Sequence, residues 1–411
     1  MSRPVALSPD SPEFKGISAL NIIYEAGLDN ESRPILVLAA CNLPNPDTIN
    51  YDLILAFILA RLDEFVENDY VLIFFSSPAL YRPPWMWLLK AYRSLDRKYK
   101  KNLKALYVLH LNRTYRIIFD LANKITSPKF ARKLHYLSTL QELFGTVKFS
   151  SKFVPKQVID FDTNLPPMPP SKWGSSQQLP VTKVDPTQKS LPSLAFGVTL
   201  DNLARLEDSE QQAAYIPKLV KQLIEHLKAH GLEKEGLFRK SPASDELHKV
   251  KESLNRGEAV DLTQHDINVS ASLLKVFFKE LPDALISPQL CSDIGKLSDP
   301  EKSSDDDIQR VKDILQKTLN ARPKEYGLLR YLFEFLGTVV QHVEKNRMTS
   351  HNLAVVFTPN LIRDSGNSTS GSGTPATQQE AMANAALYMK QMNEGMGLVQ
   401  LLITHHARVF G

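Results

Sequence analysis

The sequence predicts a multidomain protein, with an α/β domain followed by an all-α helical-bundle domain. Residues 17–160 alternate short apolar runs with helical segments, and from residue 196 to 411 the apolar spacing is helical. Between them, residues 161–195 are rich in proline and form a linker. Residues 1–16, with their Pro and Ser content, are expected to be a disordered tail.

The first domain contains buried strands separated by helices. Apolar runs ended by turn residues predict the strands 35–41, 70–75 and 103–109. The intervening segments predict helices at 51–66, 85–100, 116–122 and 137–144. This alternation predicts a parallel sheet covered by helices.

The second domain shows helical periodicity throughout. Apolar residues fall on one helix face within 216–227, and the pattern repeats within 326–344. Residues 365–380, of low complexity, are expected to be a mobile surface loop.

The linker has one pattern with a candidate partner. Pro167–Lys172 fits P-x-x-P-x-K, a ligand pattern for Src-homology 3 domains. Such patterns also arise by chance, so a plain extended spacer is the alternative.

Composition excludes several classes of protein. The net charge of +4 is too small to indicate nucleic-acid binding, and residues 1–160 carry the whole excess, with 21 Lys+Arg against 15 Asp+Glu. Two distant cysteines indicate a reducing compartment, and no signal peptide or long apolar segment is evident. We therefore expect a soluble, cytoplasmic protein whose membrane contacts are peripheral.

Local motifs for a self-contained active site are absent from the sequence. There is no phosphate-binding loop, dinucleotide fingerprint, HExxH or GxSxG, and the ten histidines show no metal-ligand spacing. We expect neither a cofactor nor a metal, and an enzyme with its own substrate pocket is not favoured.

The first informative motif is residues 235–242, EGLFRKSP, between two predicted helices. Gly236 allows a turn, and Leu237 and Phe238 can anchor the loop in the core. Arg239 would then be held in place with its planar, permanently charged head directed outward, as a donor to a phosphoryl group requires. The alternative is an ordinary surface charge.

The second motif is residues 272–282, SLLKVFFKELP, a helix that ends near Pro282. Its buried stripe consists of Leu274, Phe277, Phe278 and Leu281. Lys275 and Lys279 lie four residues apart on the other face, where they can hold an acidic or phosphate-bearing partner. The alternative is a solvated basic stripe.

The third motif is residues 346–361, NRMTSHNLAVVFTPNL. Thr349 or Ser350 can cap a helix, and Asn352 lies near its start. Asn352 is either a partner-facing donor and acceptor or the source of a structural hydrogen bond.

Together the order, wording and spacing of the three motifs resemble the RhoGAP domain family over roughly residues 196–410. The resemblance implies that Arg239 is an arginine finger that enters the active site of a Rho-family GTPase in its GTP-bound form. It implies that Lys275, Lys279 and Asn352 bind the GTPase. The chain would then be an enzyme regulator that completes the GTPase site in trans.

Two positions depart from the family pattern. Lys279 stands where the family usually has Arg, so the charge is kept and the bidentate fork is lost. Pro242 replaces the usual small residue after the serine of the finger loop. Both departures bear on rate and partner choice.

Residues 18–158 resemble the divergent CRAL-TRIO lipid-binding fold, on the strength of residues 92–110 and of Ser127–Phe130 with the helix to Leu143. The order of the domains resembles Rho GTPase-activating proteins of this architecture. The resemblance implies an apolar groove for a phospholipid tail or prenyl chain. Its candidate lining residues, which are equally explained as core, are Trp85, Trp87, Phe119 and Phe130.

A basic cluster in the same region suggests anionic lipid headgroups or the acidic face of a partner as ligands. Its headgroup-patch residues are Arg97, Lys98, Lys100 and Lys101, and Arg93 and Lys104 lie nearby. A solvated helix end is the alternative. The family also self-associates through this domain, so the resemblance includes a homodimer among the expectations.

Three functions therefore compete: a Rho GTPase activator, a scaffold that binds a GTPase without stimulating it, and a lipid-binding or lipid-transfer protein. The first requires that Arg239 be accessible near Lys275 and Asn352. Binding without stimulation would indicate the second. A closed or filled N-terminal groove would count against the third.

Overall fold

The computed structural model describes residues 11–65, 67–81, 83, 87, 91, 94–111, 128–165, 193–210, 212, 214–295, 297, 299–363, 375 and 377–411. The chain forms two compact units. One comprises Met1–Gln188 with Ser370–Met389, and the other Lys189–Thr369 with Lys390–Gly411. The long helix α18 (Gln378–Thr404) is divided between them. No helix among the described residues is long and apolar enough to span a membrane.

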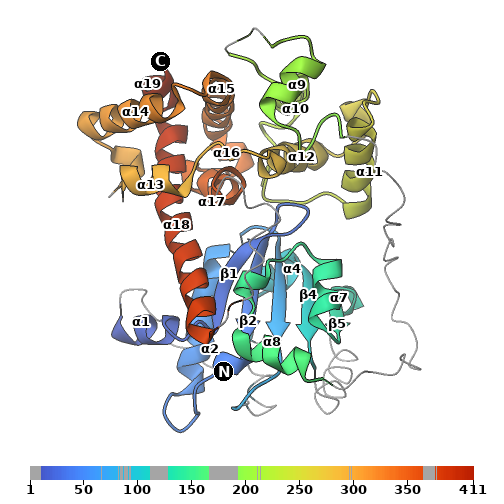
Figure 1. Cartoon of the computed structure of the whole chain (residues 1–411), viewed down its shortest axis with the longest axis vertical. Helices are drawn as coiled ribbons and strands as arrows, with labels where there is room; N and C mark the ends of the chain where they lie inside the picture. The colour runs from blue at the N-terminus through green and yellow to red at the C-terminus, as the bar shows by residue number, and fades with distance from the viewer. Residues whose placement is uncertain are drawn as a thin grey trace. The chain divides into compact units, whose positions relative to one another are not determined.

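The first unit is built on a sheet whose described strands lie in the order β1-β2-β3-β4-β5 (Figure 1). β1 runs antiparallel to β2, and the remaining pairs are parallel. The strands are β1 (Ile23–Leu28), β2 (Pro34–Ala39), β3 (Tyr70–Phe75), β4 (Leu103–Leu109) and β5 (Leu134–Leu137). The predicted strands 70–75 and 103–109 are confirmed, because a run that is apolar throughout or, in β4, apart from Lys104 marks a strand that is buried on both faces.

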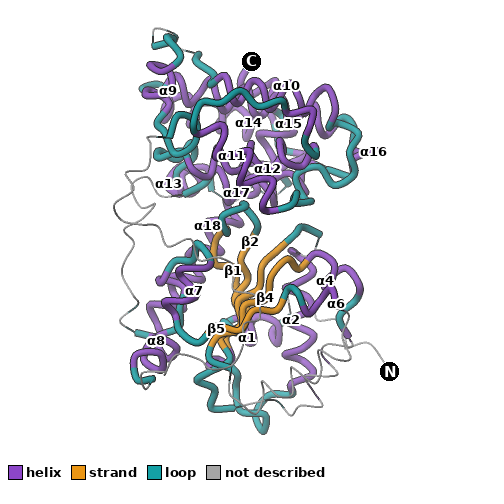
Figure 2. The backbone as a smooth tube through the Cα atoms, turned by 90° about the vertical axis from the view of Figure 1, so that its right-hand side faces the viewer, coloured by secondary structure: helices purple, strands orange, loops and turns teal. Residues whose placement is uncertain are grey.

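Helices cover both faces of this sheet, as Figure 2 shows. One face packs against α1, α2 and α4, through side chains that include Phe14, Phe57 and Tyr99. The other packs against α7, α8 and the first part of α18, through Leu143, Val158 and Ala385. The bounds of these helices are α1 (Pro12–Ser18), α2 (Tyr51–Phe65), α4 (Arg97–Asn102), α6 (Pro128–Ala131), α7 (Leu140–Thr146) and α8 (Lys156–Thr163), with short 3-10 turns η1 (Ala40–Asn42) and η2 (Ser151–Phe153).

Several sequence expectations need correction in this unit. Residues 12–16 belong to α1 and not to a tail, because the Ser11 side chain caps the helix and Phe14 is buried. Leu137 ends strand β5, and the predicted helix begins three residues later, where Thr139 caps it. β1 was not predicted. The helix predicted at 116–122 and part of the one at 85–100 lie outside the described residues, and α4 begins within the latter at Arg97.

The second unit is helical, as predicted. Its elements are α9 (Leu200–Leu206), α10 (Lys218–His230), α11 (Ser244–Asn255), η3 (Leu262–Gln264), α12 (Ile267–Glu280), α13 (Pro288–Ile294), η4 (Pro300–Lys302), α14 (Asp305–Leu319), α15 (Pro323–Val340), α16 (Val343–Asn346), α17 (Ser350–Leu361), the second part of α18, and α19 (His406–Phe410). The expected loop at 365–380 falls mostly outside the described residues, and its last residues begin α18.

Helix α12 is the central element of this unit. It packs against α10, α11 and α17, and every residue from Asn268 to Lys279 is buried. A helix that is buried all round has no solvent face, so helical periodicity alone cannot assign its polar residues to the surface. This arrangement places the second motif inside the unit and the first and third motifs against it.

Candidate functional site

The finger loop, residues 235–242, connects α10 to α11 through two residues with left-handed backbone. Gly236 has a φ of 73° and Phe238 a φ of 70°. The turn is closed by the amide of Arg239, which donates to the Gly236 carbonyl at 3.0 Å, and by that of Leu237, which donates to the Lys234 carbonyl at 3.1 Å. A bulky residue in this conformation is strained by about 1–3 kcal/mol, so other contacts must hold it.

The Phe238 ring provides one such contact. It is 1% exposed and packs edge-on against Phe357, with ring centroids 5.0 Å apart, and against Phe335 at 6.2 Å. Full burial of a phenylalanine stabilises by about 1.5–3 kcal/mol, enough to offset the backbone strain. Leu237 is buried beside it, whereas Arg239 is half-buried. The loop is therefore anchored directly before the predicted finger.

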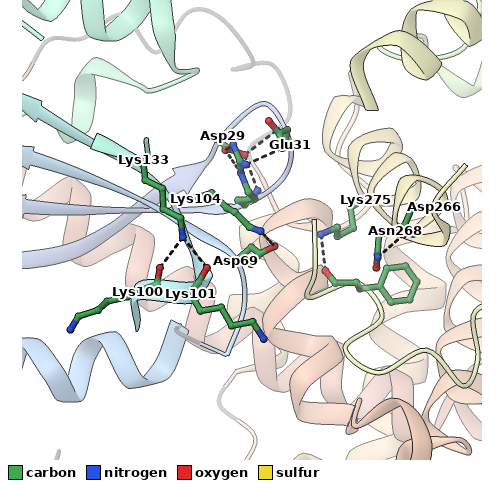
Figure 3. Close-up of polar contacts among 12 residues, drawn as sticks. Asp29, Glu31, Asp69, Lys100, Lys101, Lys104, Lys133, Asp266, Asn268 and Lys275 are labelled. Atoms are coloured by element: carbon green, nitrogen blue, oxygen red, sulfur yellow. Dashed lines mark hydrogen bonds and ion pairs between the residues drawn. The ribbon is translucent and has the colours of Figure 1, made fainter. Parts of the chain in front are cut away.

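Lys275 provides a second contact. Its ammonium group donates to the Phe238 carbonyl at 2.8 Å, as the dashed line from Lys275 in Figure 3 shows. The side chain is 3% exposed, and that of Lys279, one turn further along α12, is 8% exposed. The solvated basic stripe is therefore wrong for both lysines. Lys275 instead fixes the backbone of the residue that precedes Arg239.

The carboxyl end of α12 is held by a cation that the sequence reasoning missed. The Arg363 guanidinium donates to the carbonyls of Leu281 and Phe278. Burial lowers the pKa of Arg363, and the charges of Asp283 and Glu280 oppose that shift. A cation at a helix carboxyl end satisfies unpaired carbonyls. Only its position just beyond the third motif could have drawn attention to it.

The third motif runs from the last residue of α16 through the whole of α17. The Thr349 hydroxyl accepts from the Asn352 amide at 3.1 Å, which confirms the predicted cap. The Asn352 side chain donates to the Arg347 carbonyl at 3.1 Å and is half-buried. Asn352 therefore makes a structural hydrogen bond, the alternative weighed for it, while one side remains accessible.

A second asparagine in this motif was given no role by the sequence reasoning. Asn346 is fully buried, and its backbone carbonyl accepts from the Gly236 amide at 2.8 Å. The third motif thus contacts the first motif through the backbone. The residues of all three motifs belong to one unit, and the contacts of Lys275 and Asn346 converge on the finger loop.

In the first unit, the predicted headgroup patch lies on α4. Arg97 and Lys101 are exposed, and Lys98 forms an ion pair with Asp63. Lys133 donates to the carbonyls of Lys100 and Lys101 at 2.8 and 3.0 Å (Figure 3). Burial lowers the pKa of Lys133, and the neighbouring charge of Lys104 lowers it further.

Further contacts around α4 also involve its lysines and nearby groups. Burial lowers the pKa of Lys100. The ammonium of Lys104 lies 3.0 Å from a carboxylate oxygen of Asp69. The cluster is thus partly neutralised, whereas Lys133 caps the carboxyl end of α4, and Arg97 and Lys101 are exposed members of the cluster.

The predicted groove residues are only partly described. Trp87 and Phe130 pack against the core of the sheet face that α1 and α2 cover, in line with the core alternative. Trp87 also lines a pocket of about 540 Å³ with residues 46–52. Trp85, Phe119, Arg93 and the Src-homology 3 pattern at 167–172 lie outside the described residues. Within the described ranges no group of three metal-ligating side chains occurs.

Comparison with protein families assigns both units. The helical unit matches the RhoGAP domain over residues 217–366, and the sheet unit matches the divergent CRAL/TRIO domain over residues 32–163. The class of protein is therefore a RhoGAP-domain protein with a CRAL/TRIO-like amino-terminal domain.

Relatives extend this match to most of the chain. The chain is 34% identical to Rho GTPase-activating protein 1 of Mus musculus, over 86% of this chain and 78% of that protein. It is 32% identical to Rho GTPase-activating protein 68F of Drosophila melanogaster, over 84% and 71%. The crystal structure of human Rho GTPase activating protein 15 matches with a TM-score of 0.42 and 26% identity, over 54% of this chain and 95% of that one. The chain belongs to the Rho GTPase-activating protein family.

Proposed function

We propose that this protein accelerates GTP hydrolysis by a Rho-family GTPase, with Arg239 as the arginine finger. Membership of the Rho GTPase-activating protein family supports the regulatory role. The observation that carries the finger assignment is the anchoring of its loop. Phe238 is buried, its carbonyl is held by Lys275, and the half-buried Arg239 follows directly.

The chemistry requires such a fixed cation. During phosphoryl transfer, charge is spread over the transferring group, and a GTPase alone lacks a positive charge there. A guanidinium supplied in trans raises the rate by about 10³–10⁵, or roughly 4–7 kcal/mol of barrier. Because the finger must arrive already oriented, a loop fixed at its backbone suits this role. We propose that Lys279 and Asn352, on the neighbouring helices, bind the GTPase.

The test is GTP hydrolysis by a panel of Rho-family GTPases with the full chain and with Arg239→Ala. We expect the variant to lose about 10³-fold or more of the stimulation while it still binds the GTP-bound partner. Arg239→Lys keeps the charge without the fork and should recover little. Lys240→Ala, the matched control on the exposed neighbour, should retain stimulation. If wild type binds GTPases without stimulating any of them, the scaffold function replaces the activator.

A further inference from the structure

We propose that Asn346 is a positioning residue for the arginine finger, holding the finger loop in the conformation that presents Arg239. The inference rests on the proposed function of Arg239. Asn346 is the last residue of α16, and both its side chain and its backbone carbonyl bind other segments of the unit.

The Asn346 side chain uses three hydrogen bonds in a buried site. It is 0% exposed, and its amide nitrogen donates to the carbonyls of Leu232 and Val339, each at 2.8 Å. Its oxygen accepts from the Met348 amide, also at 2.8 Å. Leu232 begins the connection that leads from α10 into the finger loop, and Val339 lies in α15. One short side chain therefore ties three segments together.

The Asn346 backbone makes the contact closest to the finger. Its carbonyl accepts from the amide of Gly236, the residue with left-handed φ at the turn of the loop. The carbonyl of Gly236 in turn accepts from the amides of Arg239 and Lys240. Gly236 thus lies between Asn346 and Arg239, with one backbone hydrogen bond to each.

The same segment also reaches Asn352. The residue after Asn346 is Arg347, which has a left-handed φ of 62°, and its carbonyl accepts from the Asn352 side chain at 3.1 Å. The finger loop and the start of α17 are therefore each hydrogen-bonded to one of two consecutive residues, Asn346 and Arg347. The buried side chain of Asn346 holds these two residues in the core. Loss of its hydrogen bonds would therefore release the finger loop on one side and Asn352 on the other.

Asparagine is suited to this position because it offers two N–H donors and a carbonyl acceptor on a short stem. Aspartate would keep the acceptor for Met348 and lose both donors, so the carbonyls of Leu232 and Val339 would lose their bonds to residue 346, although the Val339 carbonyl still accepts from the His342 amide. Asn346→Asp is therefore a near-isosteric change that loosens the ties of the loop. The hydrogen bond to Val339 contributes to the stability of the fold and not to the finger loop directly. The test must therefore separate an effect on the position of Arg239 from an effect on stability.

The experiment measures single-turnover GTP hydrolysis by a GTPase that wild type stimulates, with increasing full-length wild type, Asn346→Asp or Arg239→Ala. For Asn346→Asp we expect the maximal rate to fall by about 10–10²-fold, because small misplacements of a catalytic group cost this much. The concentration for half-maximal rate should change far less. The same proteins are assayed for binding to the GTPase loaded with GDP and aluminium fluoride, and with a non-hydrolysable GTP analogue. For Asn346→Asp, the preference for the GTPase with GDP and aluminium fluoride over the GTPase with the GTP analogue should fall together with the maximal rate.

The matched control is Asn360→Asp. Asn360 is also 0% exposed, and its side-chain amide donates to the Val356 carbonyl within its own helix. A loss of folded protein lowers both affinities together, so this control should keep the preference for the aluminium fluoride complex. If Asn346→Asp keeps it as well while Arg239→Ala abolishes it, Asn346 is structural only. If Arg239→Ala keeps it, the finger assignment has failed instead.

A measurement on wild type covers the case in which the variant does not fold. The Gly236 amide should exchange with solvent deuterium much more slowly than an amide of an exposed loop, because Asn346 and the buried loop protect it. Exchange of Gly236 at the unprotected rate in the folded protein would overturn the inference.

Discussion

Two helices of this molecule carry neighbouring lysines, and they use them in opposite ways. On α12, Lys275 and Lys279 are 3% and 8% exposed, and the ammonium of Lys275 donates to a backbone carbonyl of the finger loop. On α4, Lys101 is exposed, and Lys98 is paired with an aspartate at the surface. The two sequences, LLKVFFKEL and RKYKKN, read alike as helices with basic residues.

The difference shows that burial decides what a lysine does. A buried ammonium needs a fixed acceptor, so the core sets its position. Its removal leaves that acceptor without a donor and allows the acceptor to move. An exposed ammonium is hydrated and screened by salt, so its contribution depends on the partner that approaches. We therefore expect a change on α12 to alter the finger, and one on α4 to alter the attraction to an anionic surface.

Among the changes that test this comparison, the largest effect is expected from Lys275→Met, which keeps the length of the side chain and removes its donor. The Phe238 carbonyl then loses a charged hydrogen bond, typically about 1.5–3 kcal/mol. If that energy is expressed in the orientation of Arg239, stimulation falls by roughly 10–10²-fold. Single-turnover hydrolysis measures this, with Lys101→Met as the matched control on α4.

Stability separates this effect from unfolding. Lys275→Met leaves the Phe238 carbonyl without this donor, which destabilises, but it also removes the cost of burying a charge, and the two contributions oppose each other. The thermal unfolding temperature of Lys275→Met should therefore stay close to that of wild type. A variant that unfolds more easily but stimulates normally once folded would contradict the comparison between the helices.

A smaller effect is expected from Arg97→Glu combined with Lys101→Glu. We propose that these residues meet anionic lipid headgroups, because they are the exposed members of the α4 cluster. Each basic residue near such a surface contributes about 1 kcal/mol, so binding to phosphatidylserine vesicles should fall at least tenfold. Stimulation of a GTPase in solution should not change.

The control for this change reverses two exposed lysines elsewhere in the same unit, Lys15 and Lys148. They lie outside α4 and should affect vesicle binding less. Binding by wild type should also weaken as salt is raised, because the attraction is screened. If the α4 variant binds vesicles as well as wild type does, the basic residues simply form a solvated helix end.

From the sequence we could propose which residues form the candidate site, but not how the fold holds them in place. Arg239, Lys275 and Asn352 were proposed from the resemblance of three motifs to the RhoGAP family. Capping rules offered Thr349 or Ser350, and Thr349 is the residue that caps α17. The burial of Lys275 could not be predicted, because periodicity assumes one solvent face and α12 has none. Asn346 could not be predicted either, since its side chain binds Leu232, 114 residues away.

The same distinction holds for the fold. Strand β3 was predicted with its correct bounds because its residues are continuously apolar. Strand β1 includes Glu25 and Gly27, and the register of its antiparallel pairing with β2 shifts between Glu25 and Leu28. Local composition does not mark such a strand, which exists because its neighbour is present.

The smallest effect concerns a histidine that contacts α12 from α10. The Nδ1 atom of His226 lies 2.9 Å from the Ser270 hydroxyl, and its ring centroid lies 5.1 Å from that of His230. Burial lowers the pKa of His226, and the charge of His230 lowers it further, whereas Asp261 acts in the opposite direction. Like Lys275, His226 meets a fixed partner, here Ser270 on α12, but it can lose its charge instead of keeping it.

The lowered pKa of His226 fixes the sign of a pH effect. Above about pH 6.5, the ordinary histidine value, both folded and unfolded states hold it neutral, and it has no effect. As the pH falls below that value, the unfolded state binds a proton more readily, so the free energy of unfolding decreases until the folded pKa is passed. Urea unfolding of the full chain at pH 7.5 and 5.5 measures this decrease, and His226→Gln should make it smaller. If His226→Gln leaves the decrease unchanged, the acid sensitivity arises elsewhere and burial next to α12 does not set the charge of this residue.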